Sequence, residues 1–277
     1  MPKTKLQETE VQLFVEMLRL RYGYDFSHYA KASLRRRVAG LCQSFGVAHI
    51  AELIPLVLHD EALLPRVLAG LSVPVTEMFR DPEVFLQLRR EVVPLLQSYP
   101  RINIWQVGCA TGEEAYSLAI LLREEGIDHR ARIFSTDIND DALSKAEEGI
   151  FAAEKLKEYS RNYFKAGGTG SLADYYHAHY DLVKIDQSLK ANILFTHHNL
   201  VSDGVFGEMQ LILCRNVLIY FDRQLQGKVL GLLRDSLARG GFLCLGIKES
   251  LVPELAKEFR AVDERLKIYR LAGGAQP

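Results

Sequence analysis

The chain contains 277 residues, of which 48% are hydrophobic and 25% charged, a composition typical of globular proteins that bury a core. This composition argues against disordered, collagen-like and coiled-coil classes, and the length predicts one or two domains. Because 34 lysines and arginines balance 35 acidic residues, the net charge of −1 indicates neither a nucleic-acid nor a membrane partner, and any basic surface must be local.

The cellular compartment is inferred from the N-terminus and the cysteines. The first ten residues are too polar for a signal peptide, and no apolar run reaches the roughly 18 residues that would span a bilayer. Four cysteines (Cys42, Cys109, Cys214 and Cys244) form no Cys-x-x-Cys pair, and three of them lie in apolar runs. We therefore expect reduced core thiols and a cytoplasmic protein without direct membrane insertion.

The first part of the chain shows helical periodicity without strand signals. Residues 10–22 and 29–45 each predict an amphipathic helix, and two more fit between residues 50 and 71. In the second helix an apolar face lies opposite a basic one, which carries Arg35, Arg36 and Arg37. We expect a small all-helical N-terminal domain over residues 1–75.

From residue 101 short apolar runs alternate with helical segments, which indicates an α/β domain with a mostly parallel sheet over residues 76–277. The expected strands are 102–107, 131–136, 192–196, 210–214 and 241–246. A helix at 222–238 is expected to end at Gly240-Gly241, and 259–262 with 267–270 predict a final hairpin. Residues 160–190 break the alternation and predict an inserted antiparallel excursion, with a surface loop as the alternative.

A glycine-containing loop follows the first expected strand and opens a helix. Gly108 and Gly112 let the backbone approach a bound ligand closely, as in nucleotide-type loops. Only two glycines of a dinucleotide fingerprint are present, and Glu113 and Glu114 would repel a pyrophosphate. These acids suit a cationic group such as an ammonium or sulfonium, or they simply complement the helix dipole.

Polar residues follow the next three strands as well. Asp137 ends the second strand, where a ribose finds its acceptor in doubly wound sheets, although it could instead cap the next helix. His197 to Leu200 and Cys214 to Asn216 follow the third and fourth strands. Since the carboxyl ends of parallel strands meet at one edge, these residues predict a single site, and the adjacent histidines lack a third metal ligand. We expect no metal.

The segment that joins the two halves carries Arg80 between apolar residues. Its guanidinium could orient a carboxylate, or it could form an interdomain salt bridge.

Together these residues resemble the CheR family of chemotaxis receptor methyltransferases over nearly the whole chain. The motifs that carry the resemblance are Ser72 to Arg80, Gly108 to Glu114 followed by Tyr116-Ser117, Ser135 to Ile138, Asn199-Leu200 and Cys214 to Asp222. The resemblance implies a helical domain followed by a doubly wound, Rossmann-like S-adenosylmethionine methyltransferase domain, in which the 160–190 insertion is the family's β-subdomain. It implies methyl transfer to receptor glutamates and S-adenosylhomocysteine as product.

The resemblance also implies roles for individual residues. The cofactor would be bound by Thr76, Arg80, Gly108, Glu114, Asp137, Asn199, Leu200, Arg215 and Asn216. Arg80 and Tyr220 would border the methyl-transfer site, and Arg35, Arg36 and Arg37 would meet the acidic cytoplasmic domain of a chemoreceptor. We expect a monomer.

Three positions depart from the family pattern. Pro74 stands where asparagine is frequent, and Gly-Ile-Lys-Glu at 246–249 replaces Gly-His-Ser-Glu while retaining Glu249. The insertion is longer and more aromatic than in enteric members, which leaves open whether it docks a receptor peptide, as the β-subdomain does in some members. Other readings are a different carboxylate acceptor, a cofactor-sensing scaffold without turnover and, undermined by the incomplete fingerprint, a nicotinamide dehydrogenase.

Overall fold

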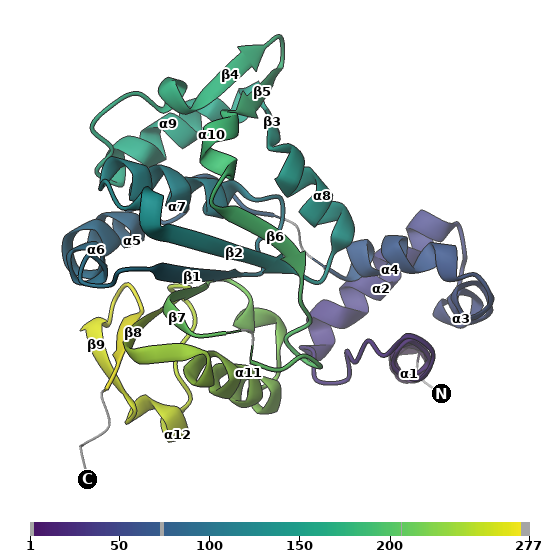
Figure 1. Ribbon diagram of the computed structural model, residues 1–277. Helices are drawn as coiled ribbons and strands as arrows, with labels where there is room; N and C mark the ends of the chain where they lie inside the picture. Colours follow the sequence, from purple (N-terminus) through teal and green to yellow (C-terminus); the bar gives the residue numbers. More distant parts are fainter. Residues whose placement is uncertain (1–2, 73–74, 206, 273–277) are drawn as a thin grey trace.

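The computed structural model describes residues 3–72, 75–205 and 207–272. A helical lobe that begins at the N-terminus lies beside a larger lobe built around a sheet (Figure 1). The helical lobe contains α1 (Lys3–Tyr22), α2 (Lys31–Phe45), α3 (Ile50–His59) and α4 (Leu64–Leu71). The predicted all-helical start is therefore confirmed, with α1 longer at its N-terminus than expected.

The helical lobe has a core of its own. Phe14 and Leu18 of α1 pack with Leu53 and Val57 of α3, and all four side chains are fully buried. On α2 the apolar stripe predicted from the sequence is buried, and Gly46 ends the helix in the left-handed conformation at φ 71°. Amphipathic periodicity alone therefore accounts for this lobe.

The larger lobe contains a seven-stranded sheet in the order β6-β2-β1-β7-β8-β10-β9. Its strands are β1 (Ile102–Val107), β2 (Ala131–Asp137), β6 (Ile193–His197), β7 (Met209–Cys214), β8 (Leu237–Leu245), β9 (Phe259–Asp263) and β10 (Ile268–Leu271). The first five in spatial order are parallel, and β10 pairs antiparallel with both β8 and β9. This confirms the predicted doubly wound sheet and its closing hairpin.

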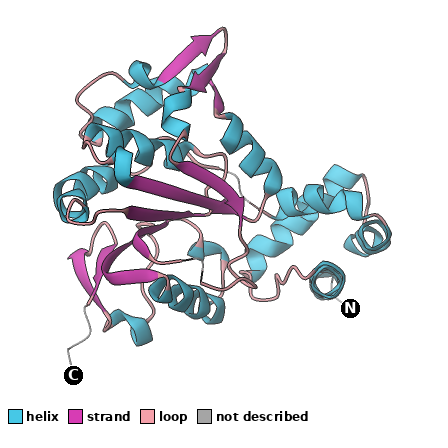
Figure 2. Ribbon diagram, in the orientation of Figure 1, coloured by secondary structure: helices cyan, strands magenta, loops and turns pink. Residues whose placement is uncertain are grey.

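Helices cover both faces of this sheet (Figure 2). They are α5 (Pro82–Gln87), continued by a π-helical turn (Leu88–Val92) into α6 (Val93–Leu96), then α7 (Glu113–Glu124), α8 (Asp140–Glu148), α11 (Arg223–Asp235) and α12 (Pro253–Ala256). Ile104 of β1 belongs to the core on the α7 side, whereas its neighbour Trp105 belongs to the core on the α11 side. The central strands are thus buried on both faces, which explains their nearly continuous apolar sequences.

One expected boundary is wrong. The helix predicted to run to Ala238 ends at Asp235, and β8 begins at Leu237, before the glycine pair. Gly240 has φ 74° and the register with β7 shifts across this stretch, so the glycines form an irregularity within a strand instead of a helix stop.

The insertion begins earlier than expected. β3 (Ile150–Ala152), β4 (Tyr176–His179) and β5 (Leu182–Ile185) form a separate antiparallel sheet in the order β3-β5-β4. Between β3 and β4 the chain passes through α9 (Leu156–Lys165), and α10 (Gln187–Lys190) follows β5. The antiparallel excursion is therefore confirmed, but β3 lies before residue 160. Its pairing partner β5 is about thirty residues away, so periodicity could not reveal it.

Candidate active site

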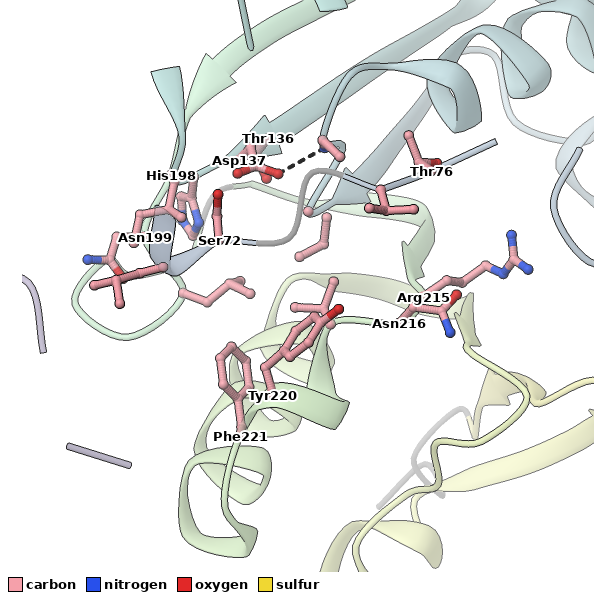
Figure 3. Close-up of a pocket in the computed structure, with 18 of the residues that line it drawn as sticks. Ser72, Thr76, Thr136, Asp137, His198, Asn199, Arg215, Asn216, Tyr220 and Phe221 are labelled. Atoms are coloured by element: carbon pink, nitrogen blue, oxygen red, sulfur yellow. Dashed lines mark hydrogen bonds between the residues drawn. The ribbon is translucent and has the colours of Figure 1, made fainter. Parts of the chain in front are cut away.

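A cavity lies between the two lobes, at the carboxyl ends of β1, β2, β6 and β7 (Figure 3). All ten residues predicted for cofactor binding or catalysis line it: Thr76, Arg80, Gly108, Glu114, Asp137, Asn199, Leu200, Arg215, Asn216 and Tyr220. The structure therefore brings the residues predicted at this sheet edge together around one cavity. Pro74 lies outside the described residues.

The loop between β1 and α7 forms the floor of this cavity. Gly108 and Gly112 have φ of 67° and 92°, and a Cβ atom on Gly108 would lie 2.6 Å from Cγ2 of Val217. Glycine is therefore required for the turn and for the close packing. Cys109 within this loop is buried, and all four cysteines are buried and free, as expected.

Asp137 holds this loop from the end of β2. Its Oδ2 accepts a hydrogen bond from the backbone N–H of Ala110 at 2.9 Å, the dashed contact in Figure 3, and its Oδ1 accepts one from Asn139 at 3.0 Å. Burial raises the pKa of this carboxyl. The helix that follows is capped by Asn139, whose side chain accepts from the N–H groups of Asp141 and Ala142, so the alternative capping role for Asp137 is wrong.

The two glutamates at the start of α7 have different partners, and only one of them lines the cavity. Glu113 turns away from the cavity and accepts hydrogen bonds from Thr111 at 2.6 Å and Tyr159 at 3.3 Å. Glu114 lines the cavity, pairs with Arg215 and accepts from Nε2 of Gln106 at 3.3 Å. Only one of the two carboxylates predicted to face a cationic ligand is therefore in position to do so.

The Arg215 side chain is completely buried and directed away from the centre of the cavity (Figure 3). Besides pairing with Glu114, it donates to the backbone oxygen of Arg80 at 2.9 Å and to Oδ2 of Asp81 at 2.7 Å. Its guanidinium thus joins α7 to the segment that carries Arg80. Arg80 itself forms no interdomain ion pair within the described residues.

Asn199 shapes the loop after β6. Its Oδ1 accepts from the N–H of Val201 at 3.0 Å, and its own N–H donates to Asp203 at 2.8 Å. In Figure 3 its amide lies at the outer edge of the group, beyond His198. Asn199 therefore orders the loop that contributes Leu200 to the lining.

The helical lobe contributes Arg37 to the cavity wall, a position that the sequence did not predict. Arg37 of α2 lines the cavity, donates to the backbone oxygen of Ser72 at 2.8 Å and lies 5.3 Å from the centre of the Tyr220 ring. Arg35 and Arg36 are exposed and lie outside the cavity lining, whereas Arg37 is half-buried within it. The available signal was the position of Arg37, three residues after buried Leu34, at the border of the apolar face.

Backbone contacts also fix Tyr220 between the lobes. The N–H of Ala30 donates to the oxygen of Tyr220 at 2.8 Å, and the N–H of Asp222 donates to the oxygen of His28 at 2.8 Å. The His28 ring is 2.9 Å from the Asp222 carboxylate. Packing of the helical lobe and placement of Tyr220 are therefore coupled.

Across residues 3–72, 75–205 and 207–272 no three histidine, cysteine or acidic side chains cluster in a way that could hold a metal ion. In the same ranges no single helix has the length and apolarity to cross a membrane, although α2 and α3, bent by 70°, pass that test as a pair.

Comparison with known proteins agrees with this architecture. Residues 9–72 match the family described as CheR methyltransferase, all-alpha domain, and residues 74–268 match CheR methyltransferase, SAM binding domain. A candidate methyltransferase of Pseudomonas putida, Cher3, is 45% identical over 260 residues, covering 94% of this chain and 93% of that one.

Two more distant relatives have names that refer to chemotaxis. The chemotaxis protein methyltransferase of Listeria innocua is 26% identical, with 88% of this chain and 91% of that one covered. Chemotaxis protein methyltransferase 1 of Vibrio cholerae is 28% identical, with 89% and 90% covered. On the two family matches, which span both lobes, the chain belongs to the CheR methyltransferase family and contains its S-adenosylmethionine-binding domain.

Proposed function

We propose that the protein transfers methyl from S-adenosylmethionine to glutamate side chains in the cytoplasmic domain of a chemoreceptor or related signalling protein. The observation that carries this proposal is the convergence of Arg37, Arg80 and Tyr220 on one cavity with the cofactor-binding loop. Two guanidinium groups and a phenol form a site suited to a carboxylate. The names of the chemotaxis relatives add support.

The cavity has features that fit the cofactor. Oε1 of Gln106, a buried residue in its lining, has no hydrogen-bond partner among the described residues, and so could accept from an ammonium group. A Cβ atom on Gly108 would clash with Val217, another lining residue, so glycine permits the close packing that shapes this part of the cavity wall. We assign the ribose hydroxyls to Asp137 and the cationic methionine portion to Glu114, aided by Gln106.

When bound, S-adenosylmethionine would supply a methyl group on a sulfonium: a carboxylate oxygen would bond to the methyl carbon in line as the carbon–sulfur bond breaks and S-adenosylhomocysteine leaves as a neutral thioether. The acceptor needs no general base, because a glutamate with an ordinary pKa near 4.3 is already ionised at neutral pH. The protein's task is therefore to orient the acceptor and to exclude water, for which positioning can supply roughly 7 kcal/mol or more. We assign this task to Arg80 and Tyr220.

The exposed arginines of α2 suit recognition of the acceptor protein. Arg35 and Arg36 lie outside the cavity on the helix that carries Arg37 into it. An acidic helix bundle docked on α2 would therefore bring its glutamates close to the cavity mouth. We propose that Arg35 and Arg36 attract the partner and that Arg37 contacts the acceptor carboxylate.

A labelling assay tests the proposal. The purified protein is incubated with methyl-labelled S-adenosylmethionine and receptor cytoplasmic fragments, and mild base then releases esters as methanol. Base-labile label on the receptor is the expected result. Fragments with the acceptor glutamates changed to alanine serve as the control. Absence of label, with cofactor binding verified by calorimetry, would overturn the glutamate assignment and favour another acceptor or a sensing scaffold.

A further inference from the structure

Glu249 is a buried carboxylate that lies beside the cavity but is not part of its lining. Its Oε2 accepts hydrogen bonds from the N–H groups of Gly246 at 2.7 Å and Asn216 at 3.0 Å. Its Oε1 accepts from the N–H of Ile219 at 3.2 Å. Backbone N–H groups therefore stabilise this carboxylate, and two of the three belong to the loop after β7.

That loop brings two cavity residues into place. Asn216 has a left-handed backbone with φ 61°, a conformation that is unfavourable for most residues but that asparagine tolerates better than other residues with a side chain. Four residues later, Tyr220 is held on its other side by the N–H of Ala30. Glu249 Oε2 is the acceptor for the Asn216 backbone N–H, so the carboxylate anchors this turn from the side away from Ala30.

We propose that Glu249 is a positioning residue: its carboxylate holds the 216–220 loop by hydrogen bonds, so that Asn216 contacts the cofactor and Tyr220 contacts the acceptor. This inference rests on the roles proposed above for Asn216 and Tyr220. Glu249 reaches neither ligand itself, and it acts through the backbone of the loop.

The contact needs both oxygens as acceptors. In Glu249→Gln an NH₂ group replaces one of the two oxygens and cannot accept a hydrogen bond. If it replaces Oε2, the contacts with Asn216 and Gly246 are lost; if it replaces Oε1, the contact with Ile219 is lost. A hydrogen bond to a charged group is worth more than a neutral one, and burial leaves water unable to replace it. We expect cofactor affinity to fall by about tenfold or more, and kcat to fall as well.

Gly246→Ala disturbs the same contact without changing the charge. A Cβ atom on Gly246 would lie 2.7 Å from Oε2 of Glu249 and 2.9 Å from the backbone nitrogen of Asn216. Because these distances are shorter than contacts that real Cβ atoms make, the carboxylate or the loop must move. We expect this variant to reproduce the kinetic changes of Glu249→Gln.

The test uses the full chain and three variants, Glu249→Gln, Gly246→Ala and, as the matched control, Glu254→Gln at an exposed glutamate of α12. Calorimetry gives the affinity for S-adenosylmethionine, steady-state assays give kcat and KM, and thermal unfolding gives the folded fraction at the assay temperature. We expect weaker cofactor binding and lower kcat per folded molecule in the first two variants, with the control unchanged.

Two results would overturn the proposal. One is wild-type affinity and kcat in Glu249→Gln. The other is a lowered unfolding midpoint with unchanged affinity and kcat per folded molecule, which would make Glu249 merely structural. If the wild-type protein binds cofactor but methylates no receptor, the proposed function fails, whereas the cofactor affinities of the variants still decide the role of Glu249.

Discussion

Replacing Arg215 with methionine tests whether its guanidinium holds the floor of the site together. Methionine keeps an apolar stem of similar length but cannot donate hydrogen bonds. The change removes the ion pairs with Glu114 and Asp81 and the bond to the backbone oxygen of Arg80. The Arg215 side chain is 0% exposed and that of Glu114 is 7% exposed, so water cannot replace the contact between them, whereas the Asp81 side chain is 34% exposed.

The cost follows from this burial. Removing one partner of a buried ion pair leaves an uncompensated charge and typically costs 3–5 kcal/mol, about ten times the contribution of an exposed pair. For a chain of this size, 1 kcal/mol lowers the unfolding midpoint by roughly 2–4 °C. We therefore expect Arg215→Met to unfold about 10 °C below the wild type.

The matched control is the same substitution at an exposed ion pair. Arg265 lies 2.6 Å from Glu83, with side chains 70% and 60% exposed. Arg265→Met should leave the midpoint nearly unchanged, because solvent screens an exposed pair and the pair contributes little to stability. Differential scanning fluorimetry or calorimetry measures both variants under identical conditions.

A double variant separates loss of the pair from loss of packing. If Glu114 carries the uncompensated charge, Glu114→Gln combined with Arg215→Met should be less destabilised than the sum of the single variants. The reasoning is refuted if Arg215→Met unfolds within about 3 °C of the wild type, or if Arg265→Met loses as much stability.

Three further changes probe the cavity. Arg80→Ala should lower kcat by about 100-fold without changing the unfolding midpoint, because the lost guanidinium orients the acceptor; near-normal methylation would contradict its role. Because burial raises the pKa of Asp137, cofactor affinity should fall on acidification sooner than for an ordinary aspartate, and Asp137→Asn should bind weakly with this pH dependence removed in calorimetry. Gly112→Ala would place a Cβ atom 2.8 Å from that of Ala146 and should therefore weaken cofactor binding. The control is Gly126→Ala, at φ 71° with no atom close to the added Cβ, which should lower stability and leave cofactor affinity unchanged.

Apolar patterning predicted most of the sheet. Each central strand is buried on both faces, so β1 and β7 appear in the sequence as nearly continuous apolar runs, interrupted only by Asn103, Gln106 and Gln210. Where burial depends on a distant partner the prediction was wrong, as for β3, which pairs with β5 at the edge of the small sheet. It was also wrong for the start of β8, where a glycine pair lies inside the strand.

The site shows the same division. Parallel strands place their carboxyl ends on one edge, so the sequence alone could bring Gly108, Asp137 and Asn216 together. It could not separate Glu113 from Glu114, because adjacent residues at a helix start differ only in which neighbours they meet. It likewise could not show that the Arg215 guanidinium binds Glu114, Asp81 and the backbone oxygen of Arg80.

The resemblance to the CheR family supplied most of the residues expected at the site. The sequence pattern by itself determined the two-part architecture and the edge of the sheet that carries the cavity. Local periodicity and strand polarity are sufficient for these, since they depend on which face of an element is buried. Only the tertiary structure decided how the charges are paired, that Arg37 enters the cavity from the helical lobe, and that Glu249 anchors the 216–220 loop. Those outcomes depend on contacts between residues far apart in the chain, which no local pattern records.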